Sequence, residues 1–190
     1  MSVLVVSTFL AVLALAAFLG VLLSVVLLTI DRGRLVPGAI HPLRELLRPV
    51  ALWLGALVAL VATAGSLYFS EVAGFVPCVL CWYQRIAMYP LVVLLGVAAW
   101  RGDAGIRRYA APLALIGALI SVYHIGVERL PGLPSGACSL AAPCDLIWVE
   151  RFGFVTIPVM ALAGFLAILT LLLVCAGGDA ETEPEPEHAS

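Results

Sequence analysis

The chain has 190 residues, of which 63% are hydrophobic and only 12% are charged, and its mean hydropathy is +1.13. This composition excludes an ordinary water-soluble domain, in which about 25% of residues are charged. The net charge of −2 is uninformative by itself, and no feature of the sequence indicates nucleic acid as a partner. We expect an all-α integral membrane protein in a lipid bilayer, because a helix satisfies its backbone hydrogen bonds internally.

Five apolar segments are long enough to cross a bilayer, for which about 20 residues suffice. They are approximately residues 3–30, 50–69, 80–100, 109–127 and 154–176. The first segment carries no charge and is too long for the core of a signal peptide, so we expect it to be retained as a helix. The predicted fold is therefore a four-helix transmembrane bundle at residues 49–176. An additional transmembrane helix and a cytoplasmic loop precede it at residues 1–48.

Seven of the ten arginines lie in two connecting segments: Arg32, Arg34, Arg44, Arg48, Arg101, Arg107 and Arg108. Arginine-rich loops stay in the cytoplasm, so we expect the N-terminus outside and the C-terminus inside. The turn before residue 80 and the loop 128–153 are then outside. The acidic, proline-rich segment 177–190 is too poor in apolar residues to fold, and we expect a disordered cytoplasmic tail.

A CxxC motif stands at the start of the third span, where Cys78 and Cys81 belong to the run PCVLCWYQR at residues 77–85. The unpaired N–H groups and partial positive charge of a helix N-terminus favour a thiolate over a thiol. Arg85 lies one turn beyond Cys81 on the same helix face, where its guanidinium can pair with a thiolate or a bound ligand. The motif predicts a redox centre at a membrane surface.

A second cysteine pair, Cys138 and Cys144, lies in a proline- and glycine-containing loop on the predicted outer side, where disulfides persist. A disulfide across five residues stabilises the fold by only about 2–3 kcal/mol, so stability alone explains it poorly. A purely structural staple remains an alternative. A zinc site shared with the CxxC is disfavoured by the wider second gap and the oxidising compartment, and we expect no metal. Cys175, at the end of the last span, is expected to be an inert packing residue.

Two blocks of sequence carry a family resemblance. The run CVLCWYQRI at residues 78–86, followed by MYP at 88–90, and the run FGFVTIP at 152–158 resemble the DsbB/BdbC family of quinone-linked membrane disulfide bond formation proteins. The resemblance covers about residues 50–175 and is closer to the BdbC type. It implies a four-helix core and says nothing of the additional first span. The short gap between Cys138 and Cys144 leaves less reach for moving Cys144 toward Cys78.

The resemblance implies an enzyme that reoxidises a DsbA- or BdbD-like thiol oxidase of thioredoxin fold outside the cytoplasm. Electrons would pass through two cysteine pairs to the quinone pool, ubiquinone or menaquinone, of the bacterial cytoplasmic (inner) membrane. Carried over by position, Cys138 is attacked by the partner and Cys144 then attacks Cys78. Cys81 is freed beside the quinone, with Arg85 as the cationic helper.

Three further residues are candidates for contact with the quinone: Trp82, Tyr83 and His124. For Trp82 and Tyr83, the aromatic belt at a membrane interface is an equally good interpretation. For His124, which would relay protons near the quinone, a hydrogen-bonded interfacial histidine is an equal alternative.

Two rival interpretations remain open. The first is a vitamin K epoxide reductase-like quinone and thiol oxidoreductase, in which the quinone-facing CxxC follows the loop pair, whereas here it precedes it. The second is a non-enzymatic membrane scaffold whose disulfides only stiffen its outer loops. Redox titration separates the scaffold from the enzymes, because structural disulfides resist reduction.

Overall fold

A computed structural model describes residues 2–32, 41–130, 138 and 142–176 of the chain. The predicted acidic tail and the side chain of Cys175 lie outside this part. The elements in chain order are α1 (Val3–Arg32), α2 (His41–Leu47), α3 (Ala51–Leu67) with a π-helical turn (Tyr68–Val72), α4 (Val79–Arg101), a 3-10 turn (Ala104–Ile106), α5 (Arg107–Arg129), β1 (Glu150–Arg151), β2 (Val155–Thr156) and α6 (Ile157–Ala176).

Four helical segments of the described chain are long and apolar enough to span a membrane: Val3–Asp31, Ala51–Val72, Val79–Arg101 and Ala104–Arg129. Helix α6 is apolar over Ile157–Leu173, and its 20 residues extend for about 30 Å. The predicted class, a helical multi-pass membrane protein with a four-helix bundle and an additional N-terminal helix, is confirmed. The short helix α2 was not predicted.

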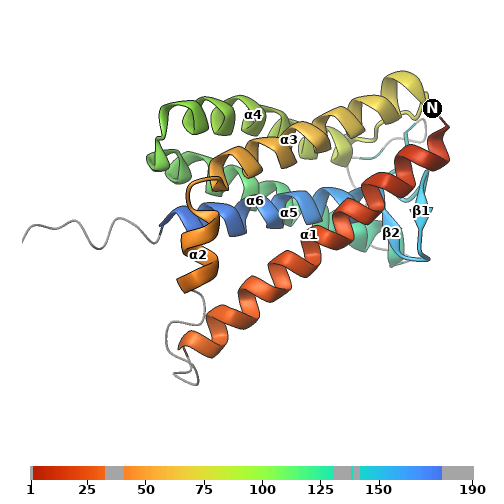
Figure 1. Cartoon of the computed structure of the whole chain (residues 1–190). Helices are drawn as coiled ribbons and strands as arrows, with labels where there is room; N and C mark the ends of the chain where they lie inside the picture. The colour runs from red at the N-terminus through yellow and green to blue at the C-terminus, as the bar shows by residue number, and fades with distance from the viewer. Residues whose placement is uncertain (1, 33–40, 131–137, 139–141, 177–190) are drawn as a thin grey trace, which may run out of the picture.

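Helices α3, α4, α5 and α6 form the bundle, and α1 crosses it obliquely against α6 (Figure 1). The N-terminal end of α1 lies beside the hairpin of β1 and β2, whereas its other end diverges from the bundle (Figure 1). The start of α4 lies at the hairpin end, and α2 lies at the opposite end (Figure 1). The CxxC and the hairpin therefore share one end of the molecule.

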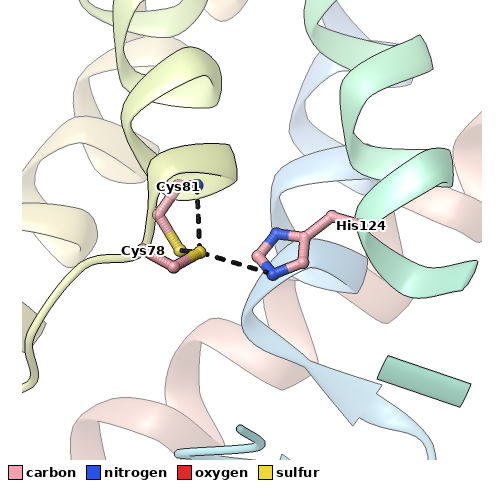
Figure 2. A group of neighbouring side chains, drawn as sticks. All are labelled: Cys78, Cys81 and His124. Carbon is pink, nitrogen blue, oxygen red and sulfur yellow. Dashed lines mark hydrogen bonds between the residues drawn. The ribbon is translucent and has the colours of Figure 1, made fainter. Parts of the chain in front are cut away.

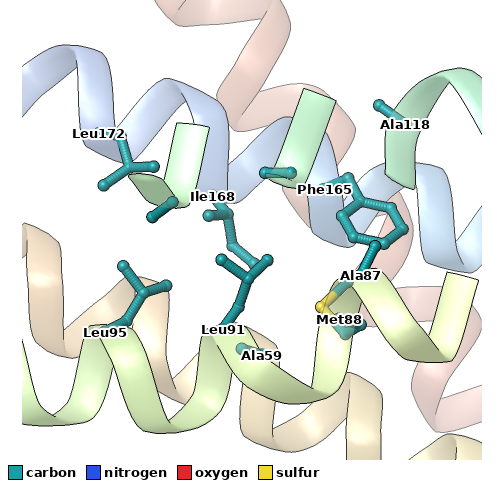
Figure 3. Close-up of a cluster of buried hydrophobic side chains, with 11 residues drawn as sticks. Ala59, Ala87, Met88, Leu91, Leu95, Ala118, Phe165, Ile168 and Leu172 are labelled. Atoms are coloured by element: carbon teal, nitrogen blue, oxygen red, sulfur yellow. The ribbon is translucent and has the colours of Figure 1, made fainter. Parts of the chain in front are cut away.

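The core of the bundle combines large side chains from α4 and α6 with small ones from α3 and α5. Figure 3 shows Leu91 and Leu95 of α4 beside Phe165, Ile168 and Leu172 of α6. Small residues let membrane helices approach closely, and α5 presents such a row, namely Ala110, Ala114, Gly117, Ala118 and Ser121.

Gly117 shows how tight this contact is. A Cβ atom on Gly117 would overlap the ring of Phe165, which is fully buried. The absence of a side chain at this position therefore allows α5 and α6 to pack at their observed separation.

The last helix begins later than the sequence predicted. Residue 154 was expected to open the span, but β2 occupies Val155–Thr156 and α6 starts at Ile157. Phe152 and Gly153 both have positive φ angles, 55° and 77°, as a tight hairpin turn between twisted strands requires. The outer loop is also shorter than predicted at its start, because α5 continues to Arg129.

Polar contacts tie this hairpin to α5. Arg129 forms a 2.7 Å ion pair with Glu150 of β1, and Thr156 donates a 2.6 Å hydrogen bond to Glu128. The end of α5 and the start of α6 are thereby held together beside the CxxC.

Candidate redox site

The CxxC caps the N-terminus of α4. Cys78 has extended backbone angles (φ −71°, ψ 171°), and its Sγ accepts a hydrogen bond from the N–H of Cys81 at 3.4 Å, as a serine cap would. The two sulfurs lie 3.2 Å apart, within hydrogen-bonding distance and well beyond a disulfide bond. The pair is thus reduced, with a hydrogen bond between its two sulfurs (Figure 2).

His124 faces this dithiol from α5 (Figure 2). Its Nε2 lies 3.7 Å from Sγ of Cys78 and 3.1 Å from the carbonyl oxygen of Cys144. The imidazole is only 3% exposed, and its Nδ1 has no hydrogen-bond partner among the described residues. One ring nitrogen therefore lies within reach of both cysteine pairs.

Negative charge is stabilised on Cys78. The hydrogen bond with the Cys81 side chain lowers the pKa of Cys78 most, and His124 lowers this pKa further. The pKa of Cys78 thus falls to about 4, although burial raises it. The sulfur of Cys78 also accepts the N–H of Cys81, a bond that favours an anionic acceptor. The surroundings of Cys78 therefore favour a thiolate at this position.

The second pair forms a disulfide, Cys138–Cys144, with its Cα atoms 5.8 Å apart. Cys144 is buried and packs in one cluster with Cys78, Leu80 and Val127. A small cavity of about 20 Å³ is lined by both CxxC cysteines, His124 and Cys144. The short gap between Cys138 and Cys144 therefore does not keep the loop disulfide away from the CxxC.

A much larger cavity, of about 760 Å³, lies among α1, α3, α4 and α6. Cys81 lines it together with Gln84 and Arg85, and Cys81 also lines the small cavity. Cys78 and Cys144 line the small cavity and are absent from the lining of the large one. The CxxC consequently stands between the loop disulfide and the large cavity.

Arg85 brings a cation to the wall of this cavity. Its guanidinium donates to the carbonyl oxygen of Ser66 at 3.1 Å and lies 5.2 Å from the centre of the Trp82 ring. The residue is only 9% exposed, and its Nε has no partner within the described residues. Since arginine offers five N–H donors, this group can still bind an acceptor oxygen of a ligand.

Aromatic rings cover the hairpin end of the large cavity. Phe75 stacks on Trp148 with ring centres 4.8 Å apart and on Phe69 at 5.9 Å, and all three rings line the cavity. This stack therefore forms part of the cavity wall. No periodicity of the sequence indicated it, because Trp148 follows the loop disulfide and meets Phe75 only through the fold.

The structure brings together six of the eight predicted site residues: Cys78, Cys81, Cys138, Cys144, Arg85 and His124. Trp82 and Tyr83 are 52% and 46% exposed and are absent from the lining of both cavities. His124 lines the small cavity and not the large one. Sequence reasoning missed Ser66 and Tyr89, whose hydroxyls are 3.3 Å apart beside Arg85.

The donor atoms of Cys78, Cys81 and His124 lie within 4.8 Å of one another, close enough for one metal ion. This set is one ligand short of the four that a structural zinc site uses, and the neighbouring Cys144 is committed to a disulfide. The donor set therefore fits thiol–disulfide exchange better than a structural metal centre.

Comparison with known proteins agrees with this chemistry. A family model described as disulfide bond formation protein DsbB matches residues 48–142. The chain belongs to the DsbB family. Disulfide bond formation protein C of Bacillus subtilis is 46% identical over 136 residues, which are 70% of this chain and 98% of that protein.

Two further relatives are similar to this chain over most of their own lengths. A probable disulfide formation protein C 1 of Bacillus cereus is 47% identical over 66% of this chain and 91% of its own. A probable disulfide formation protein of Coxiella burnetii is 44% identical over 134 residues, which are 70% of this chain and 90% of that protein. No solved structure matches. Family membership makes the chain a membrane thiol–disulfide oxidoreductase, closer to the BdbC type.

Proposed function

We propose that this protein reoxidises a DsbA-type thiol oxidase of thioredoxin fold and passes the electrons to a membrane quinone. The observation that carries the proposal is the position of the CxxC between the loop disulfide and the large cavity. A purely structural pair of disulfides would need neither a reduced CxxC at a helix cap nor a buried cation beside a ligand-sized cavity.

The first exchange takes place at the loop disulfide. Cys144 is 2% exposed whereas Cys138 is half-buried, so the partner thiolate attacks Cys138 and forms a mixed disulfide with it. Cys144 leaves as a thiolate, and the partner's second thiol then releases Cys138. The partner leaves oxidised, and its two electrons remain on the membrane protein.

The second exchange joins the two pairs. Cys144 attacks Cys78 of the oxidised CxxC, forming a Cys144–Cys78 disulfide and freeing the Cys81 thiolate beside the large cavity. Cys138 then attacks Cys144, which restores the loop disulfide and releases Cys78. Because a thiol of low pKa departs faster, the stabilised Cys78 thiolate favours this last step and drives electrons into the CxxC.

Re-oxidation of the CxxC needs a two-electron acceptor, and a quinone supplies one, taking two electrons and two protons to become a quinol. Cys81 donates from the cavity wall, and Arg85 binds the acceptor oxygen on which negative charge develops. His124, beside Cys78, stabilises the negative charge on this sulfur during exchange. A role of His124 in relaying protons to the quinone stays a prediction. Contact of Trp82 and Tyr83 with a quinone stays a prediction.

We also infer that the hairpin end of the bundle faces outside the cytoplasm at the bacterial inner membrane. The far end holds α2, the end of α4 and the start of α5 (Figure 1). These segments carry Arg44, Arg101, Arg107 and Arg108, as the preference of arginine for cytoplasmic segments predicts. A CxxC that precedes the loop pair in the chain argues against a vitamin K epoxide reductase-like arrangement.

The test is reduction of ubiquinone or menaquinone by the purified protein, driven by a reduced DsbA-type oxidase. Wild-type protein should turn over, whereas Cys138→Ser should lose partner-driven turnover. Dithiothreitol, a small dithiol able to reduce the CxxC directly, should still drive quinone reduction by Cys138→Ser. Partner-driven turnover undiminished in Cys138→Ser, or no turnover in the wild-type protein with either quinone, would refute the proposal.

A further inference from the structure

Helix α1 forms one wall of the large cavity. Its N-terminal half contributes Phe9, Leu10, Leu13, Ala14, Ala16 and Ala17 to the lining. The rest of α1 diverges from the bundle (Figure 1), and side chains there such as Leu19 and Leu22 are mostly exposed. The family model begins at residue 48, after this helix. The wall is thus added to the bundle by a segment outside the family match.

Specific contacts hold this half of α1 in place. The fully buried Ser7 accepts a 2.9 Å hydrogen bond from Nε of Arg151 in β1. Leu10 reaches across to α3, where a Cβ on Gly65 would come within 2.7 Å of its side chain. Ala11 is fully buried, on the helix that packs against α6. The wall is therefore fastened to the hairpin, to α3 and to α6.

The cavity is much longer than a quinone ring. Its lining on α6 extends from Ile157 to Leu171 and on α3 from Leu54 to Ser66, which correspond to about 21 Å and 18 Å of helix. Apart from Trp148 in the aromatic stack, the polar side chains of its lining gather near the CxxC: Ser66, Ser70, Cys81, Gln84, Arg85 and Tyr89. The remainder is apolar. This asymmetry fits a polar ring held at Arg85 and a long hydrocarbon chain extending away from it.

We propose that α1 is the binding wall for the isoprenoid tail of the quinone, with Leu13, Ala14 and Ala17 in contact with the tail. This inference rests on the proposed function. A tail bound against α1 adds apolar contact that a tailless ring cannot make, so α1 sets the preference for tail length without touching the reacting atoms. The ring keeps its contacts with α4.

The test measures binding separately from turnover. Long-tailed ubiquinone and menaquinone, and the tailless form of each, are titrated into the full-length protein, with quenching of tryptophan fluorescence as the readout. In Ala17→Phe, a phenyl ring fills tail space, and the dissociation constant of the long-tailed quinones should rise about tenfold, a 1.4 kcal/mol loss. The tailless forms should bind as they do to wild-type protein.

Val12→Phe is the matched control, because Val12 lies on the same helix, is 51% exposed and is absent from the cavity lining. It should bind both forms as the wild-type protein does. Leu13→Ala gives a second variant that adds no bulk, and it should also weaken binding of the long-tailed forms alone. A long-tailed quinone with a photoreactive group at the end of its tail should label α1.

Equal losses for long-tailed and tailless quinones, or no loss for either, would overturn the role of α1 while leaving quinone use intact. Labelling confined to α3 or α6 would also overturn the role of α1. Loss of the label when excess phospholipid is added would assign the α1 wall to lipid acyl chains instead. If the wild-type protein bound no quinone at all, the proposed function and this inference would fail together.

Discussion

The imidazole of His124 and the thiol of Cys78 face each other across the interface of α4 and α5, with Nε2 3.7 Å from Sγ. The same nitrogen lies 3.1 Å from the carbonyl oxygen of Cys144. A single side chain thereby connects the helix cap that carries the CxxC with the loop that carries the disulfide. The contact with His124 adds to the hydrogen bond from Cys81 in lowering the pKa of Cys78. It also places Cys78 beside the loop that carries the second pair.

The ionisation of Cys78 can be measured directly. In the reduced protein, a pH titration of thiolate absorbance in the ultraviolet should show one thiolate with a midpoint near pH 4. This pKa lies below that of a cysteine in the unfolded chain, so ionisation of Cys78 stabilises the reduced fold. The stabilisation is complete at pH values above the unfolded-state pKa and is lost as the pH falls toward about 4.

Two variants separate the causes of this shift. Cys81→Ala removes the largest contribution and should raise the midpoint most, and His124→Ala should raise it by less. A wild-type midpoint at the ordinary cysteine value, about 8.5, would contradict the assignment of the charge to Cys78.

The partner should attach to Cys138 and not to Cys144. A variant of a DsbA-type oxidase that keeps only its nucleophilic cysteine should form a stable mixed disulfide. This variant lacks the second thiol that would release Cys138. Peptide mapping after alkylation should locate the bond at Cys138, since Cys144 is 2% exposed. The variant Cys138→Ser, which has no loop disulfide to attack, should form no adduct, and an adduct mapped to Cys144 would reverse the order of the relay.

Arg85 should act on quinone and not on the partner. Loss of a charge-assisted hydrogen bond of about 1.5–3 kcal/mol should lower kcat/KM for quinone roughly 10- to 150-fold in Arg85→Ala. The KM for the reduced partner should be unchanged, because Arg85 lines the large cavity and not the small one. Arg101→Ala, at the other end of α4, is the control. Equal kcat/KM for quinone in Arg85→Ala and wild-type protein would remove Arg85 from the site.

The contact between Gly117 and Phe165 predicts a stability effect. Gly117→Ala forces the buried ring to move and should destabilise the bundle by about 1–3 kcal/mol, measured as a lower Tm in detergent. Gly96→Ala on α4 is the matched control, since a Cβ there meets nothing within 4 Å. It should leave the Tm unchanged or raise it, because alanine favours a helix. An unchanged Tm in Gly117→Ala would show that α6 moves away without cost.

Much of the fold could be predicted because membrane spans are encoded in local composition. Long apolar runs identified α1, α3, α4, α5 and α6 without any knowledge of how they pack. The hairpin before α6 escaped prediction because two residues with positive φ, Phe152 and Gly153, decide it, and Phe rarely adopts that conformation. Helix α2 escaped because it is too short to show a clear pattern.

The part of the site that lies on one helix was predictable from the sequence. The part that forms only when distant segments pack together was not. The CxxC and Arg85 share one helix, so their spacing alone indicated that they act together. Sequence reasoning emphasised a Cys81 thiolate paired with Arg85, whereas the cap geometry favours a thiolate at Cys78. Neither the contact of His124 with Cys78 nor the wall formed by α1 follows from spacing, because each joins segments far apart in the chain.

In the proposed mechanism electrons leave the protein from Cys81, which quinone reduction by cysteine variants can test. Quinone reduction driven by the reduced partner is followed for wild-type protein, Cys81→Ser and Cys175→Ser. Cys175 is the control because it belongs to neither cysteine pair. Cys81→Ser should abolish quinone reduction, and Cys175→Ser should retain the wild-type rate. Full quinone reduction by Cys81→Ser would contradict this mechanism.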